Sequence, residues 1–398
     1  MSHLWRGTSE DAILNQSPFP LRDQSLLKVV SGMSDLIPFG SSKSMAFGTI
    51  FAACVALNLI AGFVNHIDDT DEVYGYWEPL HYLLFGNGMQ TWEYAPQYAL
   101  RTYAFIVPIL VGTFPMSLVV PRHIIFQCIR VLLASFTAYC ESRFVASINA
   151  YFGWNEAFMT LVLMLLSPGI FFSSTSYLPS AVAMNFVMLS YSSWLYGQFI
   201  GTILFGSIAV LWSGWPFVGV LFLPVGLSMV ISIFSTDARA MICGFQGGFS
   251  GFLRLAMLGL MVVVFTALPA AIIDFQFYRK STSPTINITL YNAIGSGDEL
   301  YGIEPASYYI RNLLLNMGLS WMLVLLSPFI LASEGLIART IPKPNKESSD
   351  SNTTIDRSTS SFTVWFRKWF LPCPSPSHIC LWKVHLWLPA GMYNQSRY

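Results

Sequence analysis

The sequence predicts an all-α polytopic membrane protein. Of its 398 residues, 54% are hydrophobic and only 11% are charged, whereas soluble domains carry about 25% charged residues. The mean hydropathy of +0.53 points the same way. Several apolar runs are long enough to cross a hydrocarbon core of about 30 Å, which takes about 20 helical residues. They lie at 45–64, 102–120, 123–141, 156–173, 178–197, 199–235, 252–273 and 313–337.

The number of crossings depends on the run at 199–235. Trp215-Pro216 interrupts this run, so it forms either two short spans or one span with a re-entrant piece. We therefore expect a bundle of eight or nine crossings. The polar segment 1–44 shows no cleaved signal peptide and is expected to be cytosolic. The run at 45–64, preceded by Lys43, then acts as an uncleaved first span and places the next loop on the far side.

Charge and cysteine use argue against nucleic-acid binding and against a disulfide framework. The formal net charge is zero, so there is no electrostatic attraction to nucleic acid. No two cysteines form a CxxC pair, and most lie in or beside apolar runs, which favours small buried hydrophobes over metal ligands. The cysteines are Cys54, Cys128, Cys140, Cys243, Cys373 and Cys380.

The first polar loop, residues 65–100, is strongly acidic and has no Lys or Arg before Arg101. Carboxylates at a membrane edge are disfavoured by desolvation and mutual repulsion, so they are expected to face a water-filled cleft and to have a function. They are Asp68, Asp69, Asp71, Glu72, Glu78 and Glu93. Apolar residues from Trp77 to Phe85 recur at helical spacing before Gly86, which predicts a short amphipathic helix in the headgroup layer.

A second polar loop, residues 274–312, contains an N-glycosylation pattern at Asn287-Ile288-Thr289, which is usable only if the loop is lumenal. If both polar loops lie on one side of the membrane, they form a composite site. We expect a multi-span domain over 45–338. Residues 342–361 are typical of a disordered linker, so we expect 339–398 to be a disordered or atypical tail.

The acidic cluster allows three interpretations. Asp69 and Asp71, with Glu72 adjacent, can supply a general base whose proton affinity a neighbouring carboxylate raises. The same oxygens can bind a divalent cation. They can also form a solvated acidic loop without chemistry. No histidine stands beside them at ligand spacing, so we predict no metal site.

The cluster begins a longer pattern of residues. It runs through Asp69-Thr70-Asp71-Glu72, Tyr76-Trp77-Glu78-Pro79, His81-Tyr82-Leu83, Gln90-Thr91-Trp92-Glu93-Tyr94, Arg101, Arg130-Val131-Leu132, Phe171-Phe172-Ser173-Ser174, Leu178-Pro179-Ser180, Gly214-Trp215-Pro216-Phe217, Tyr291-Asn292, Leu300-Tyr301-Gly302 and Glu304-Pro305. This pattern resembles the endoplasmic-reticulum mannosyltransferases that use dolichyl-phosphate mannose, a membrane GT-C type. The resemblance is strongest to the α-1,2-mannosyltransferases of lipid-linked oligosaccharide assembly and covers about residues 45–335.

The resemblance implies a multi-pass enzyme of the endoplasmic-reticulum membrane, whose lumenal active site is built from the first loop. It implies a polyprenyl-phosphate sugar donor, a lipid-linked oligosaccharide acceptor and no cofactor. Mannose would be transferred with inversion during N-glycan precursor assembly. Asp71 is the first choice for the base and Asp69 the second, while Glu72 positions sugar hydroxyls. Arg101 would stabilise the departing phosphate, or it simply reaches the membrane interface.

Further residues are candidates for substrate binding. They are His81, Trp77, Glu78, Trp92, Tyr94, Tyr301 and Glu304. The aromatic residues can stack on sugar rings or form an interfacial belt. Arg130 and Glu141 lie three turns apart on one predicted span, so we expect them to share a face toward the bundle interior or to contact the donor.

The chain departs from this pattern near residue 338, and its tail resembles a C-terminally truncated or alternatively spliced form. Two functions stay open at this stage. One is an active α-1,2-mannosyltransferase, with the α-1,6 and GPI-anchor enzymes as related alternatives. The other is an inactive membrane form that binds the donor lipid or a full-length partner. A transporter is disfavoured because no internal repeat is evident.

Overall fold

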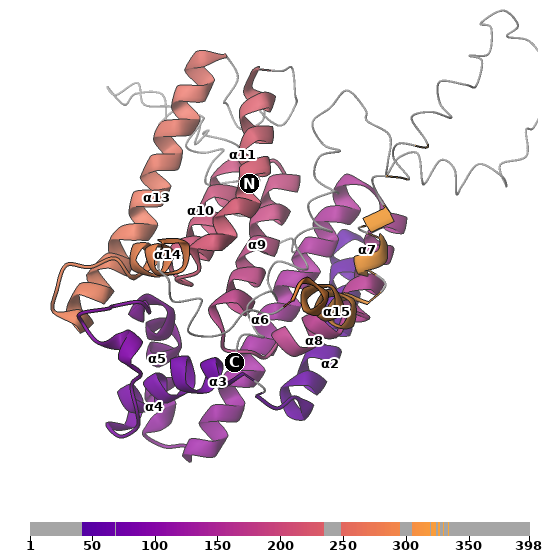
Figure 1. The fold of residues 1–398 in the computed structure, drawn as a ribbon. Coiled ribbons are helices and arrows are strands. Elements are labelled where there is room, and N and C mark those ends of the chain that lie inside the picture. Colours follow the sequence, from indigo (N-terminus) through magenta and orange to yellow (C-terminus); the bar gives the residue numbers. More distant parts are fainter. Residues whose placement is uncertain are drawn as a thin grey trace, which may run out of the picture. The chain divides into compact units, whose positions relative to one another are not determined.

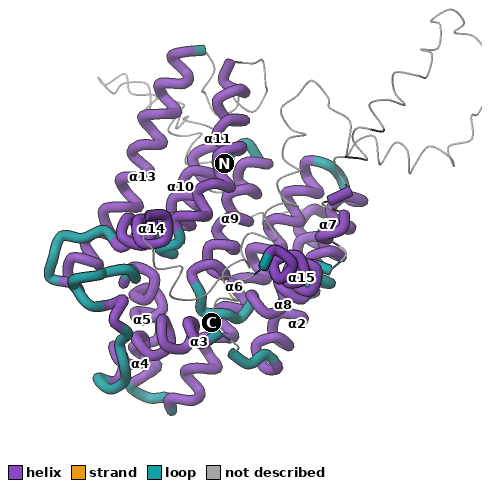
Figure 2. Tube along the Cα trace, viewed as in Figure 1, coloured by secondary structure: helices purple, strands orange, loops and turns teal. Residues whose placement is uncertain are grey.

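The computed structural model describes residues 42–67, 69–234, 248–294 and 305–318, together with 320–323, 325–326, 329 and 333. Residues 45–398 form one unit, and every contact given below lies within it. The ordered elements in the described part are all helical (Figures 1 and 2). The helices are α2 (Ser42–Val64), α3 (Thr70–Glu72), α4 (Glu78–Phe85), α5 (Tyr103–Ser117), α6 (Arg122–Tyr151), α7 (Trp154–Leu165), α8 (Pro168–Ser173), α9 (Pro179–Leu195), α10 (Phe199–Leu211), α11 (Gly219–Phe234), α13 (Phe249–Tyr278), α14 (Pro284–Ile294) and α15 (Ala306–Met317).

Four of these segments are long and apolar enough to cross a membrane. They are Phe47–Val64, Arg122–Tyr151, Pro216–Phe234 and Phe249–Tyr278. Along α13, Leu260, Met261 and Phe265 expose 65%, 61% and 76% of their surface. Large apolar side chains that have no protein to cover them are what a lipid-facing helix presents. These findings confirm the predicted all-α polytopic membrane fold.

One predicted span needs correction, and one predicted interruption is confirmed. The expected single span at 156–173 is wrong, because α7 ends at Leu165 and α8 begins at Pro168. Proline lacks the N–H that would continue the first helix but fits the first turn of the next one. The break expected in 199–235 is confirmed, since a turn and the 3₁₀ segment Pro216–Val218 separate α10 from α11. The last expected span, 313–337, is described only in part, with gaps from residue 319 onward.

Helix α9 lies at the centre of the bundle, packed against α6 and α10 (Figure 1). Its Asn185 donates to Thr137 Oγ1 at 2.9 Å, and Thr137 donates to the carbonyl of Ser174. Small polar residues of this kind join membrane helices by hydrogen bonds. On α6, Arg130 and Glu141 are both buried, as their shared face predicted. Glu141 accepts a hydrogen bond from Asn58 of α2 at 2.9 Å.

The amphipathic helix predicted in the first loop is confirmed as α4. Leu80 packs into the core, and the helix ends where Gly86 adopts φ +70°. Only glycine reaches that left-handed conformation without a steric penalty. Before α4, the short helix α3 continues through the π-helical segment Val73–Trp77. The acidic part of the loop is therefore an ordered helical segment.

Candidate active site in the first polar loop

Two aspartates of the first loop, Asp69 and Asp71, lie at the start of α3. Asp69 caps this helix, and its Oδ1 accepts a hydrogen bond from the backbone N–H of Asp71 at 2.9 Å. Burial, with smaller contributions from the charges of Asp71 and Glu72, raises the pKa of Asp69 to about 6. A carboxyl that titrates near neutral pH is suited to acid–base chemistry.

Arg101 connects the end of the loop to its acidic start. Its Nη2 lies 2.6 Å from Asp71 Oδ1 and 2.9 Å from Glu93 Oε1, and its Nε lies 3.0 Å from Glu93 Oε2. Nη1 donates to the hydroxyl of Tyr76. Burial alone would lower the pKa of Arg101, but Tyr76 and the two carboxylates raise it above its usual value.

Arg101 compensates part of the negative charge of Asp71 and Glu93. Two carboxylates face one guanidinium, and Glu93 binds it in bidentate fashion, the strongest geometry for such a pair. The side chain of Asp71 remains 22% exposed, whereas that of Arg101 is only 10% exposed. In this structure Arg101 therefore orients Asp71, and its charge is already compensated. The contact with a departing phosphate that the sequence suggested stays a prediction.

Gly75 is a residue of this site that the sequence reasoning missed. A Cβ atom placed on it would lie 2.9 Å from Asp71 Oδ1, too close for a normal contact. Its carbonyl accepts a hydrogen bond from the hydroxyl of Tyr94 at 2.7 Å. The only available signal was a glycine between two tyrosines inside a helical segment, where glycine is unfavourable.

Glu72 points away from the aspartates and is buried. Its Oε1 accepts from Trp77 Nε1 at 2.9 Å and from the N–H of Tyr177 at 2.8 Å, while Oε2 accepts from the hydroxyl of Ser176. This carboxylate thus attaches the first loop to the segment between α8 and α9. In this geometry Glu72 holds in place the segment that carries its neighbour Asp71, and its predicted contact with sugar hydroxyls stays untested.

The C-terminal turns of α13 hold the other end of the loop. Asp274 accepts from Thr102 Oγ1 at 3.0 and 2.9 Å and from the N–H of Tyr103 at 2.7 Å. The hydroxyl of Tyr278 donates to the carbonyl of Arg101 at 2.5 Å. This arrangement could not be predicted from the sequence, because Asp274 looked like one acidic residue of the second polar loop.

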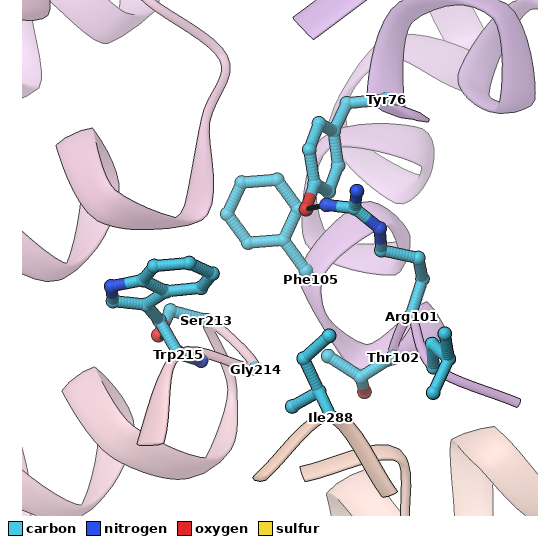
Figure 3. Close-up of a pocket in the computed structure, with 9 residues that line it drawn as sticks. Tyr76, Arg101, Thr102, Phe105, Ser213, Gly214, Trp215 and Ile288 are labelled. Atoms are coloured by element: carbon cyan, nitrogen blue, oxygen red, sulfur yellow. Dashed lines mark hydrogen bonds between the residues drawn. The ribbon is translucent and has the colours of Figure 1, made fainter. Parts of the chain in front are cut away.

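A small pocket lies beside Arg101 (Figure 3). Arg101, Tyr76 and Phe105 line one side, and the turn at Ser213–Trp215 and Ile288 close the other. It has room for about one water molecule. The pocket is too small for a mannosyl group, so we do not assign it to the substrate.

The two polar loops come together, as a composite site requires. Asn287 of α14 donates to the carbonyls of Tyr98 and Ala99 at 3.0 and 3.1 Å. The rings of Trp92 and Tyr291 lie 6.2 Å apart. The side-chain amide of Asn287 is therefore engaged by the first loop, and a glycan on it would break these contacts.

The remaining predicted residues divide into those near Asp71 and those away from it. Trp77 and Tyr94 contact the cluster through Glu72 and Gly75. His81 Nδ1 lies 2.8 Å from the carbonyl of Asn87, and Glu78 accepts from the N–H of Met89 at 3.2 Å, so both side chains of α4 contact the turn that follows this helix. Trp92 is half exposed against Tyr98. Tyr301 and Glu304 lie outside the described residues.

The comparisons with known proteins identify the family of the chain. Residues 49–369 match the model of the Alg9-like mannosyltransferase family. The chain belongs to the Alg9-like mannosyltransferase family. It is similar to the alpha-1,2-mannosyltransferases Alg9 of Drosophila melanogaster (33% identity, over 81% of this chain and 49% of the relative), ALG9 of Homo sapiens (31%, 70% and 43%) and alg9 of Schizosaccharomyces pombe (33%, 73% and 50%).

The chain thus spans about half the length of these curated relatives. The family match covers the first loop, the helices that hold it and α14, so the whole described site lies within it. No solved structure gave a significant match to this chain.

Proposed function

We propose that this chain transfers mannose from dolichyl-phosphate mannose to a dolichyl-diphosphate-linked oligosaccharide and forms an α-1,2 linkage. Its place in the Alg9-like family and the names of its relatives support the reaction class. The observation that carries the proposal is Asp71, a partly exposed carboxylate that Arg101 holds in one orientation within a folded loop at the end of membrane helices.

In the proposed reaction an acceptor hydroxyl oxygen attacks the anomeric carbon of the mannosyl donor. The bond from that carbon to the phosphate oxygen breaks, and its electron pair leaves with the dolichyl phosphate. Asp71 takes the proton of the attacking hydroxyl. A phosphate leaves as a stable anion, so no second acid is needed. A single displacement inverts the anomeric centre, which gives an α product from a β-linked donor.

Asp71 is proposed as the base because its position is fixed by the surrounding side chains, and a fixed position is what productive alignment requires. Asp69 is the second candidate because its pKa of about 6 leaves it ready to exchange a proton. Asp69 also caps the helix that carries Asp71, so it supports the base even if it never meets the hydroxyl.

The decisive experiment is mannose transfer in microsomes that lack the endogenous enzyme. The unaltered chain should extend the lipid-linked glycan, and Asp71→Asn should abolish the extension while the protein still inserts. Asp69→Asn should retain measurable transfer, since the cap can be kept by the amide oxygen. Absence of transfer by the unaltered chain would refute the proposed function. If Asp69→Asn abolishes transfer and Asp71→Asn does not, the base is Asp69.

The proposal also places the first loop in the lumen of the endoplasmic reticulum. Met89→Thr converts the exposed turn Asn87-Gly88-Met89 into a glycosylation acceptor pattern. A lumenal loop predicts a mobility shift that is removed by an endoglycosidase and is absent in the double variant Asn87→Gln/Met89→Thr. An unshifted protein that is inserted and stable would place the loop on the cytosolic side, contrary to the proposal.

A further inference from the structure

Arg130 of α6 is a buried cation whose hydrogen-bonding capacity is mostly unused. Its side chain is only 6% exposed. Nη2 donates to Thr175 Oγ1 at a long 3.4 Å, and the buried Nε has no partner within the described part of the chain. No carboxylate described here lies within ion-pair distance of it. The guanidinium packs 5.7 Å from the ring centre of Phe126.

Such a group is costly in a membrane helix unless something compensates it. A buried charge without hydrogen bonds is disfavoured by several kcal/mol, and intramembrane arginines typically mark ligand sites. Arg101, by contrast, already binds Asp71 and Glu93. Of these two buried arginines near the first loop, Arg130 is the one with donors left for an anion.

The surroundings of Arg130 contain further polar side chains and connect it to the candidate active site. Asn65, at the end of α2, donates to Thr175 Oγ1 at 3.4 Å and to the carbonyl of Phe171 at 3.0 Å. Thr175 is followed by Ser176, whose hydroxyl donates to Glu72. The guanidinium therefore lies on the other side of the segment that positions the loop of Asp71.

The outer surface near this point is apolar. Gln127, one turn before Arg130, donates to the carbonyl of Gly62 at 2.9 Å and so ties α6 to the end of α2. The next two residues of α2, Phe63 and Val64, are 69% and 68% exposed. An anionic headgroup at Arg130 would thus have an apolar surface beside it for a hydrocarbon tail.

We propose that Arg130 binds the phosphate group of the polyprenyl phosphate, assisted by Thr175 and Asn65. This inference rests on the proposed function, because that function supplies the polyprenyl-phosphate ligand. The fork of N–H donors on a guanidinium matches phosphate oxygens, and the long bond to Thr175 is weak enough to be replaced. The phosphate of an ordinary anionic phospholipid offers the same chemistry, and the binding test distinguishes this lipid from dolichyl phosphate.

The test is binding of dolichyl phosphate to the full-length chain in neutral-lipid nanodiscs, with phosphatidic acid as competitor. The unaltered chain should bind dolichyl phosphate in preference to phosphatidic acid. Arg130→Gln should weaken binding at least about tenfold, and Arg130→Lys should weaken it less because the charge remains. The matched control is Arg143→Gln, on the same helix, where the equally buried Arg143 packs against Tyr196. The Arg143→Gln variant should bind dolichyl phosphate as tightly as the unaltered chain.

Folding is checked by the melting temperature of each variant, and only variants that melt like the parent are compared. Equal binding of the two lipids, or unchanged binding in Arg130→Gln, would overturn the inference. Asp71→Asn should bind dolichyl phosphate normally yet transfer nothing. If the unaltered chain transfers nothing but its binding depends on Arg130, the proposed function fails and the phosphate site stands.

Discussion

Removing the carboxylate of Glu72 should release the first loop from the segment before α9. In Glu72→Ala, three donors lose their acceptor: Trp77 Nε1, the Ser176 hydroxyl and the Tyr177 N–H. Hydrogen bonds to a charged group contribute about 1.5–3 kcal/mol each. Because the three donors share one carboxylate, their contributions are not additive, and we expect a local loss of about 3–5 kcal/mol.

The backbone amide of Tyr177 reports this loss directly, because its hydrogen bond goes to Glu72. A loss of about 3 kcal/mol corresponds to about a hundredfold faster hydrogen exchange if exchange follows local opening. Ser176→Ala serves as the control, since it removes one donor and leaves the Tyr177 bond in place. Its effect on the Tyr177 amide should be several-fold smaller.

The same experiment separates a positioning role for Glu72 from contact with the sugar. A positioning role predicts that transfer and Tyr177 protection fall together in Glu72→Ala and partly recover in Glu72→Gln, which keeps an oxygen acceptor. Unchanged Tyr177 protection in an inactive Glu72→Ala would refute the reasoning, because Glu72 would then act on substrate and not on the loop.

Three further predictions follow from the geometry of the loop. Gly75→Ala places a methyl group 2.9 Å from Asp71 Oδ1. This variant should reduce mannose transfer at least tenfold without changing the melting temperature. Normal transfer would show that the orientation of Asp71 is unimportant. The pKa of Asp69 is raised to about 6 from 3.8, so its contribution to stability is complete below about pH 4 and is lost as the pH rises through about 6. Asp69→Asn should therefore flatten the dependence of the melting temperature on pH in this range. An unchanged dependence would contradict the assignment. Gly214 has φ +67°, and a Cβ atom there would lie 2.6 Å from Thr102 Cγ2. Gly214→Ala should therefore lower the melting temperature by several degrees. Gly219→Ala is the control and should leave the melting temperature unchanged, because its added Cβ meets no close atom.

The membrane fold could be predicted from the sequence because hydropathy and proline positions act locally. The break before Pro216 and the end of α4 at Gly86 depend only on neighbouring residues. The span expected at 156–173 was wrong for a related reason: the apolar run continued through Pro168, and hydropathy outweighed the helix-breaking signal. The acidic loop was found because unpaired charge near lipid is unusual in any sequence.

The partners within the site could not be predicted, because they come from distant parts of the chain. Arg101 lies 30 residues from Asp71, and Glu72 lies 104 residues from Ser176. Nothing in the local sequence says which carboxylate a single arginine will bind. Asp274, 172 residues from Thr102, shows the same limit, since its role depends on how α13 packs against α5.

The charges of the first loop and of Arg130 explain why the proposed base and the proposed phosphate site belong to different elements. In the first loop, Asp71 and Glu93 share one guanidinium, so negative charge predominates there. A phosphate needs the opposite surroundings, and Arg130 provides a cation without a carboxylate at ion-pair distance in the described structure. The two environments meet at residues 175–177, where Thr175 contacts Arg130 and the next two residues bind Glu72. A displaced 175–177 segment should disturb both, so Glu72→Ala should raise the KM for the donor as well as lower kcat. A change in kcat alone would mean that the two sites are independent.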